Sequence, residues 1–244
     1  MSRRVFGSAV ATAALVGAMV SGQTPTVDDI VAKNLAAKGG IEKLRAVTSV
    51  KMTGRIKSPG GEMPVVSYAK RPNMRRRENT NDGQTFILAF DGKTVWAVNP
   101  LMSTRPTEIN GPPADKTRQD ADDFDSVLLD YKAKGRAVEL VGTEAVQGIT
   151  MHRLRVTTKT GAIQEIYINA ETMLESKMVM QIEQAGRKGV VTSEFSNYKE
   201  VDGIKVPLHI RQTFNGQLMA EVIYDQVQFN APMDDALFTM PKQP

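Results

Sequence analysis

A long run of alternating strand and turn signals, residues 138–229, places the strongest constraint on the fold of this chain. Short β-prone segments follow one another there, separated by turn-type pairs such as Asp202-Gly203 and Asn215-Gly216. Strands joined by short turns pair in the antiparallel sense. The predicted strands are residues 138–141, 152–156, 163–168, 174–182, 190–195, 208–214 and 219–229.

Further strands precede this run, because residues 47–69 change to a strand-like period around a turn at residues 58–61. The predicted total is about eleven or twelve strands, and a sheet of that size curls, closes or divides into two layers. Residues 174–182 show how its faces differ. Glu175, Lys177 and Gln181 point to one side, and the other side carries Leu174, Ser176, Met178, Met180 and Ile182. We therefore expect a curled sheet with one dry face and one largely wet face.

Residues 86–100 predict a hairpin, because Asp91-Gly92 stands between two β-rich segments. If the loop has two residues, alternation defines two faces. One face carries Phe86, Leu88, Phe90, Val95 and Ala97, and the other carries Ile87, Ala89, Trp96 and Val98. Both sets are apolar, so we expect protein or a ligand to cover both sides of this hairpin.

Three helices are expected to cover the dry face, at residues 27–38, 41–46 and 120–134. The first begins with a capping-box pattern formed by Thr26 and Asp29. The third follows an irregular, proline-rich loop at residues 101–116, and its apolar stripe includes Phe124 and Leu128. A short helical turn near the C-terminus is expected to dock Phe238 against the sheet.

Residues 1–22 predict a cleaved secretory signal peptide, with Arg3 and Arg4 before an uncharged apolar run. Residues 23–244 then form a single domain, which we expect to be a soluble, exported monomer. The chain has no cysteine, which excludes disulfides and an N-terminal lipid-modified cysteine. Loss of the two arginines lowers the formal charge from +4 to +2, so nothing favours nucleic acid as a partner.

Residue patterns give no support for catalysis. The two histidines, His152 and His209, stand in separate predicted strands, and no hydrolase, zinc-protease or nucleotide-binding motif is present. The aspartates between residues 115 and 125 do not have EF-hand spacing. We therefore expect no enzyme activity, no metal site and no cofactor. The alternative, a hydrolase acting on lipid or cell-wall material, needs a nucleophile or a carboxylate pair that the sequence does not reveal.

Two interpretations of other segments stay open. The run Arg75, Arg76 and Arg77 is interpreted as the solvated side of a strand, with an anionic headgroup or partner as the alternative. The dry face either encloses a hydrophobic cavity, which methionines would make adaptable, or is filled by the helices. In the second case the protein would be a structural or interaction module of the cell envelope.

Five segments together resemble the bacterial outer-membrane lipoprotein-sorting proteins related to the LolA and LolB carriers. They lie at residues 29–44, 90–96, 129–135, 198–207 and 232–238, in the same order along the chain. The resemblance implies an incomplete, strongly curved antiparallel β-barrel, with helices as a lid over a hydrophobic cavity. It also implies a periplasmic location and transfer of lipoprotein acyl chains from an inner-membrane donor to an outer-membrane acceptor. Carriers of this kind hold the lid shut with an arginine, for which the candidates are Arg55, Arg75 and Arg77.

These expectations combine into a non-enzymatic periplasmic carrier of lipids or lipoproteins. Cargo would displace Phe124 and Leu128 from the cavity when the lid opens. The residues predicted to line the cavity are Phe86, Leu88, Trp96, Phe124, Leu128, Met178 and Met180.

Overall fold

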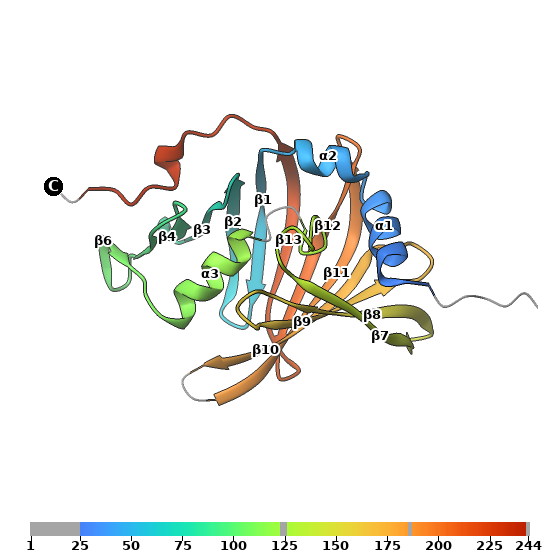
Figure 1. Ribbon diagram of the computed structural model, residues 1–244. Helices are drawn as coiled ribbons and strands as arrows, with labels where there is room; N and C mark the ends of the chain where they lie inside the picture. The colour runs from blue at the N-terminus through green and yellow to red at the C-terminus, as the bar shows by residue number, and fades with distance from the viewer. Residues whose placement is uncertain (1–24, 123–125, 185–186, 243–244) are drawn as a thin grey trace, which may run out of the picture.

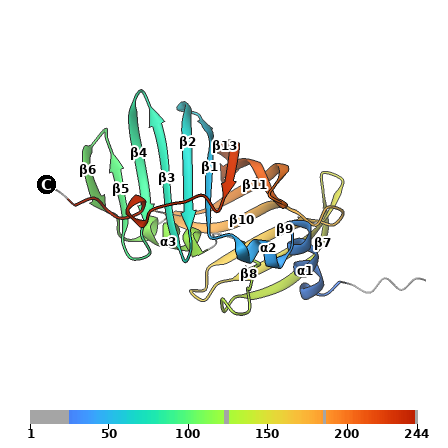
Figure 2. The ribbon, with the colours of Figure 1, turned by 90° about the horizontal axis from the view of Figure 1, so that it is seen from above.

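The fold is one antiparallel sheet of thirteen strands, seen in a computed structural model that describes residues 25–122, 126–184 and 187–242 (Figure 1). The strand order is β6-β5-β4-β3-β2-β1-β13-β12-β11-β10-β9-β8-β7, which leaves β6 and β7 at its two ends (Figure 2). The strands are β1 (Ser49–Ser58), β2 (Gly61–Lys70), β3 (Met74–Asn81), β4 (Gln84–Phe90), β5 (Val95–Asn99), β6 (Ser103–Glu108), β7 (Ala137–Val146), β8 (Ile149–Thr157), β9 (Ile163–Asn169), β10 (Glu175–Gln184), β11 (Arg187–Val201), β12 (Ile204–Phe214) and β13 (Gln217–Phe229).

The prediction of a large antiparallel sheet is confirmed, and the sheet is curved and open. The seven strands predicted between residues 138 and 229 are all present, although most extend further than predicted. The additional strand is β6, in a segment for which an irregular loop was predicted. Its Pro106 is tolerated because an edge strand can spare one backbone donor.

The first and last strands meet in the middle of the sheet, where β1 pairs with β13. A β-bulge interrupts this pairing between Thr53 and Gly54. A Cβ atom on residue 54 would lie 2.0 Å from the carbonyl oxygen of Ile223, so the close approach of the two strands requires glycine. The bulge also increases local twist, which helps the sheet to curve.

The hairpin β4–β5 is covered on both sides, as its two apolar faces predicted. Its loop has four residues, and the Asp91 carboxylate accepts hydrogen bonds from the backbone N–H groups of Lys93 and Thr94, at 2.8 and 2.7 Å. Phe90 therefore pairs with Val95. Because this register differs by two residues from that of a two-residue loop, every side chain keeps its predicted face.

Three short helical elements lie where they were predicted. Helix α1 (Val27–Ala37) begins with the capping box of Thr26 and Asp29, helix α2 (Ile41–Ala46) follows it, and η1 (Asp235–Leu237) precedes the fully buried Phe238. Apolar residues of α1 pack with inward-facing residues of β8 and β9 in one core cluster. Helix α1 therefore covers the concave face at one end of the sheet.

The helix predicted at residues 120–134 is wrong. The structure instead has α3 (Pro112–Asp122), followed by turns over residues 127–135, and residues 123–125 lie outside the described residues. Prolines 112 and 113 are compatible with the start of α3, because the first turn of a helix needs no backbone donors there. Ser126 accepts a hydrogen bond from the backbone N–H of Leu128, and Asp130 has a φ of 53°, so this part of the chain turns repeatedly.

Helix α3 and the C-terminal segment cover opposite sides of the β4–β5 hairpin. On the concave side, Phe90 and Val95 pack with Ala114 and Ala121 of α3. On the convex side, Trp96 is fully buried, and its indole N–H donates a 2.7 Å hydrogen bond to the carbonyl of Phe238.

Replacement of Trp96 by phenylalanine tests this C-terminal anchor. We expect Trp96→Phe to lower the free energy of unfolding by about 1–3 kcal/mol, because the buried Phe238 carbonyl loses its donor. Denaturant unfolding measures the change. An unchanged midpoint would show that the C-terminal segment is not held through this hydrogen bond.

Candidate functional site

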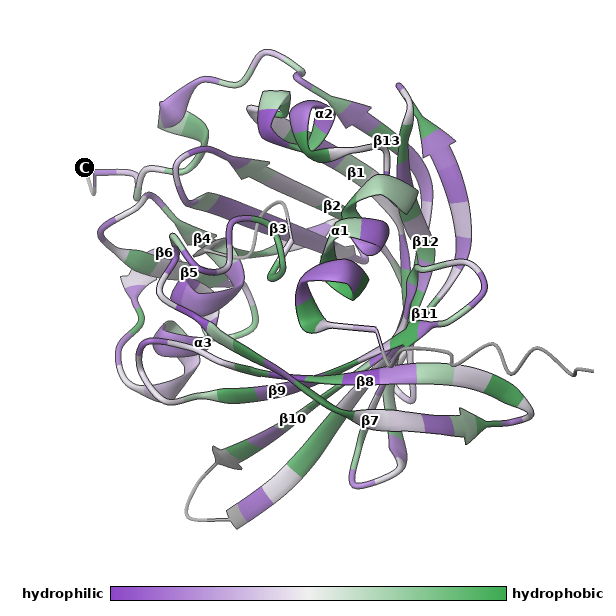
Figure 3. Ribbon diagram, turned by 45° about the vertical axis from the view of Figure 1, so that its right-hand side comes forward, coloured by the Kyte–Doolittle hydropathy of each residue, from purple (hydrophilic) through white to green (hydrophobic). Residues whose placement is uncertain are grey.

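A hollow of about 340 Å³ lies on the concave face, between α3 and the inner side of strands β9 to β12. Its apolar wall follows the register of the sheet. Met178 is opposite Ile166 on β9 and Ser193 on β11, and Met180 is opposite Val191. Phe195 is opposite Ile210 on β12, and both also line the hollow. The two covers of the concave face, α1 with the turns after residue 126 and α3 itself, leave this part of the sheet unfilled. Figure 3 shows the alternation of apolar and polar residues along these strands.

Uncharged polar side chains of β9, β11 and β12 also line the hollow. The amide nitrogen of Gln212 lies 3.3 Å from the hydroxyl of Ser193 and donates to it. Gln164 is almost fully buried, and its amide oxygen has no hydrogen-bond partner among the described residues. Ligand pockets commonly combine an apolar wall with a few polar groups of this type, and volumes start at about 300 Å³.

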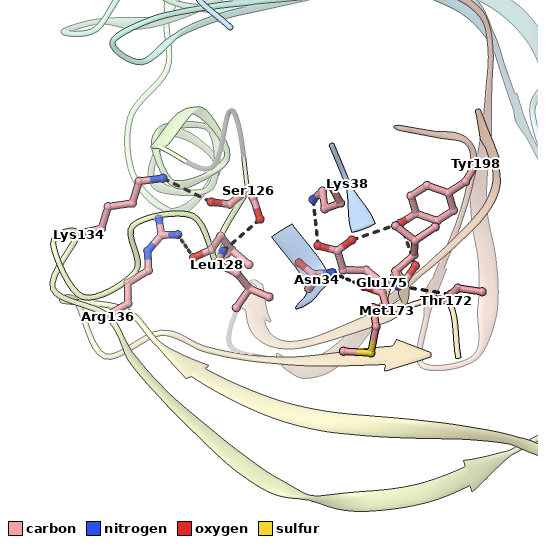
Figure 4. Close-up of polar contacts among 12 residues, drawn as sticks. Asn34, Lys38, Ser126, Leu128, Lys134, Arg136, Thr172, Met173, Glu175 and Tyr198 are labelled. Atoms are coloured by element: carbon pink, nitrogen blue, oxygen red, sulfur yellow. Dashed lines mark hydrogen bonds and ion pairs between the residues drawn. The ribbon is translucent and has the colours of Figure 1, made fainter. Parts of the chain in front are cut away.

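A buried charged network closes one end of the hollow (Figure 4). The ammonium of Lys38, at the end of α1, lies 3.0 Å from the carboxylate of Glu175, and the two side chains are only 14% and 12% exposed. The hydroxyl of Tyr198 donates to the backbone carbonyl of Glu175 at 2.9 Å. Glu175 was predicted on the wet face of β10, but a β-bulge between Glu175 and Lys177 turns it inward.

The charges of this network give it a structural role, which is to link α1 to the sheet. Burial raises the pKa of Glu175, but the attraction of Lys38 and the hydrogen bonds to the carboxylate together outweigh it and leave the pKa below its usual value. Burial, followed by the Glu175 charge, raises the pKa of Tyr198. At neutral pH the carboxylate is therefore charged and the phenol is protonated. The network joins α1 to β10 and β11.

Helix α3 is held at the other side of the hollow by charged groups near its C-terminal end. Lys116 forms an ion pair with Asp120 one turn later on α3. The guanidinium of Arg75, on β3, donates a 2.9 Å hydrogen bond to the backbone carbonyl of Asp120. A cation suits this position because the end of a helix carries a partial negative charge. Of the arginines that were candidates to hold the cover, Arg75 links the covering helix α3 to the sheet. Arg55 pairs instead with Asp225 on the convex face.

The structure places only part of the predicted lining set at this hollow. Met178 and Met180 line it together. Phe86 and Leu88 share the concave face of β4 but are not among its lining residues, and Leu88 is 39% exposed. Trp96 lies on the opposite face of the sheet, so it does not line the hollow.

The two predicted residues of the covering segment have different outcomes. Leu128 is fully buried in the core cluster of α1, β8 and β9, where Ser126 and Arg136 help to fix its turn (Figure 4). It therefore belongs to the permanent core and not to the hollow. Phe124 lies outside the described residues.

Sequence reasoning missed the contributions of β11 and β12. Val191 and Phe195 lie on the concave face of β11, where every second residue points inward. Ile210 and the polar Gln212 lie on the concave face of β12 in the same way. This period of two was a usable signal, because the same rule identified Met178 and Met180 on β10. Two other depressions, whose lining includes Ile163, Val179 and Val190, share no lining residue with the concave hollow.

Comparison with solved structures identifies the architecture. No known family model matches the sequence, and no curated protein is significantly similar to it. None of the described helices has the length and apolar character needed to cross a membrane. A DUF1329 family protein from Desulfovibrio piger is 15% identical, with a TM-score of 0.62 over 88% of this chain and 98% of that one.

Two further solved structures have a similar fold. A LolA superfamily protein from Nitrosomonas europaea is 14% identical, with a TM-score of 0.56 over 88% of this chain and 98% of that one. A putative outer membrane lipoprotein-sorting protein domain from Vibrio parahaemolyticus is 14% identical, with a TM-score of 0.53 over 86% and 94% of the two chains. Similarity at these identities establishes the fold alone. The chain has the curved, helix-covered sheet of the LolA superfamily and lipoprotein-sorting structures.

Proposed function

We propose that this protein is a non-enzymatic periplasmic carrier, which binds the acyl chains of lipids or lipoproteins in the concave hollow and moves them toward the outer membrane. The observation that supports it most directly is the unfilled apolar hollow between α3 and β9 to β12. Burial of an acyl chain there would gain about 0.8 kcal/mol for each methylene removed from water, before the costs of binding. The fold shared with lipoprotein-sorting structures supports the same function.

The hollow is suited to chains of varied shape because methionines form part of its wall. Met178 and Met180 have unbranched, flexible side chains, which can repack around different apolar ligands. Helix α3 is the element that would move. Its contact with the sheet relies on the small side chains of Ala114 and Ala121 and on the hydrogen bond from Arg75.

Hydrolysis is less well supported than carriage. Ser126 and Ser193 line the hollow, whereas the described hydrogen bonds of the histidines are to Thr143 and Ser196. On the convex face, His209 lies between Ser196 and Glu221, which are on the two neighbouring strands. However, 4.0 Å separates the Nε2 atom of His209 from the carboxylate of Glu221. None of these three residues lines the hollow.

The proposed function is tested by organic extraction of protein purified from its native host, followed by mass spectrometry. We expect acylated molecules to copurify in an amount comparable to that of the protein. The delipidated protein should then bind a neutral monoacylglycerol in competition with a fluorescent acyl probe. If the purified protein carries no acylated molecule and binds neither monoacylglycerol nor the fluorescent acyl probe, it is not a carrier.

The role of α3 as the moving cover is tested with Arg75→Ala. Loss of one hydrogen bond of about 1 kcal/mol should raise the dissociation rate of bound monoacylglycerol by roughly fivefold. A neutral ligand is chosen so that the charge of Arg75 has no direct effect on it. Arg55→Ala removes an equal charge from the convex face and should leave the rate unchanged. Equal rates in all three proteins would show that Arg75 does not restrain the cover.

A further inference from the structure

Two arginines on β3 point to the concave face, and no described carboxylate pairs with them. Arg75 and Arg77 are two residues apart, so they share one face, on which they pair with Phe90 and Leu88 of β4. Neither forms an ion pair with a carboxylate in the described part of the chain. Arg76, between them, points to the convex face, where its guanidinium lies 5.4 Å from the centre of the Trp96 ring. The prediction that residues 75–77 form the solvated side of a strand is therefore wrong.

Arg77 has a guanidinium nitrogen that is buried without a described partner. Its Nε donates to the side-chain oxygen of Asn79 at 3.2 Å, but its Nη2 is inaccessible to solvent and has no hydrogen-bond partner among the described residues. Burial lowers the pKa of Arg77 below its usual value, yet a guanidinium stays protonated in proteins. A buried cation without a paired carboxylate costs stability. The guanidinium therefore keeps hydrogen-bond donors that no described group satisfies, in addition to the Nε that is bonded to Asn79.

The described carboxylates around the hollow form their ion pairs with lysines and not with these arginines. Both carboxylates that line the hollow already have lysine partners, since Glu175 pairs with Lys38 and Asp120 with Lys116. Of the two arginines only Arg75 lines the hollow, and its described hydrogen bond goes to an uncharged backbone carbonyl. Arg77 lies two residues further along the same face of β3. Among the described residues that line the hollow, the three cations Lys38, Arg75 and Lys116 therefore outnumber the two carboxylates, directly beside an apolar wall.

We propose that Arg77, with Arg75 beside it, binds the anionic headgroup of an acidic lipid whose acyl chain occupies the hollow. A phosphate or carboxylate suits the site because guanidinium groups donate paired hydrogen bonds to planar or tetrahedral oxyanions. The apolar wall formed by Met178, Phe195 and Ile210 would hold the chain of the same molecule. This inference rests on the proposed carrier function and narrows its cargo to anionic amphiphiles.

The test compares three single-chain lipids of equal acyl length with the delipidated protein. Lysophosphatidylglycerol is anionic, lysophosphatidylcholine carries no net charge, and monoacylglycerol is neutral. We expect the natural protein to bind lysophosphatidylglycerol at least roughly tenfold more tightly than monoacylglycerol, the gain typical of hydrogen bonds to a charged group. Arg77→Gln should lose this preference and keep its affinity for monoacylglycerol. Arg55→Gln, which removes a charge from the convex face, should keep the preference.

A second measurement separates ligand binding from a structural role for Arg77. Without lipid, Arg77→Gln should unfold at the same temperature as the natural protein or at a higher one, because an uncompensated buried charge has been removed. With lysophosphatidylglycerol, the natural protein should gain more thermal stability than the variant. A variant that is less stable without lipid would assign Arg77 to the structure and overturn the proposal.

The remaining outcomes distinguish this inference from the carrier function. Equal affinity for the three lipids, or an unchanged preference in Arg77→Gln, would overturn the headgroup site while leaving acyl binding intact. Inorganic phosphate that binds with the same affinity as lysophosphatidylglycerol would show a site for free anions and overturn the lipid assignment. Failure of all three lipids to bind would overturn the carrier function together with this inference.

Discussion

Replacement of Met178 by aspartate is expected to reduce the affinity for monoacylglycerol by at least about a hundredfold, while the sheet stays folded. Met178 is only partly buried, because one side of it faces the hollow. An aspartate there can remain hydrated in the empty protein. An acyl chain that enters the hollow would remove this water, and the cost of burying an unpaired carboxylate is several kcal/mol. A hundredfold loss corresponds to about 2.7 kcal/mol, so it lies within that cost.

A neighbouring residue supplies the matched control. Val179 is also partly buried and lies next to Met178 on β10, but it points to the opposite face. Val179→Asp introduces the same charge and should leave monoacylglycerol affinity unchanged. Competition binding gives the affinities, and circular dichroism shows whether each variant is folded. Equal losses in the two variants, or none in Met178→Asp, would contradict the assignment of the hollow as the acyl site.

Leu128 illustrates why a similar substitution there would be uninformative. The sequence predicted Leu128 on a mobile covering helix, but the structure buries it completely among residues of α1, β8 and β9. An aspartate at this position would be buried in the permanent core and would destabilise the whole protein. A loss of lipid binding would then report unfolding and not the loss of a lining residue.

Alternation along single strands made most of the sheet predictable. Polar and apolar residues alternate locally in β10, and Asp91-Gly92 marks the β4–β5 turn, so neither prediction required knowledge of distant parts of the chain. The faces of the hairpin survived an error in loop length because the shift was two residues. Helix α1 was predictable for the same reason, since Thr26 and Asp29 lie within one turn of each other.

Positions set by distant contacts could not be obtained in this way. Trp96 is a large apolar residue of the type that lines cavities. Its position in β5 places it on the convex face, where Phe238, more than a hundred residues away in the sequence, contacts it. Glu175 turns inward because of a bulge whose partner strand is β9. Helix α3 begins at two prolines that locally favour a loop, and its packing on Phe90 and Val95 decides otherwise. The hollow itself depends on where the covers end, which is a property of the assembled fold.

Replacement of Glu175 by glutamine is expected to lower the free energy of unfolding by about 3–5 kcal/mol at neutral pH. This is the usual cost of removing one partner of a buried ion pair, because the other charge is left uncompensated. Lys38 is 14% exposed and has its ion pair with Glu175, so it would be that charge. The substitution also weakens the tie between α1 and β10, which closes one end of the hollow. Denaturant unfolding measures the difference.

The dependence of this effect on pH identifies the carboxylate charge as its cause. The pKa of Glu175 is lower in the folded protein than its ordinary value of 4.5, so folding favours the charged form. The stabilisation is therefore fully present above about pH 5 and is lost as the pH falls through the folded pKa. The difference in the free energy of unfolding between the natural protein and Glu175→Gln should stay constant from pH 7 to about 5 and become smaller below pH 5.

An exposed ion pair provides the comparison that decides this prediction. Glu62 contacts Arg55 and Lys57 on the surface, and its side chain is 48% exposed. Because water screens such pairs, Glu62→Gln should cost less than about 1 kcal/mol at any pH. If Glu175→Gln costs no more than Glu62→Gln, the Lys38–Glu175 pair is not the tie that fixes α1 to the sheet. In that case the end of the hollow at Tyr198 would be free to open, and cargo could enter beside α1 as well as beneath α3.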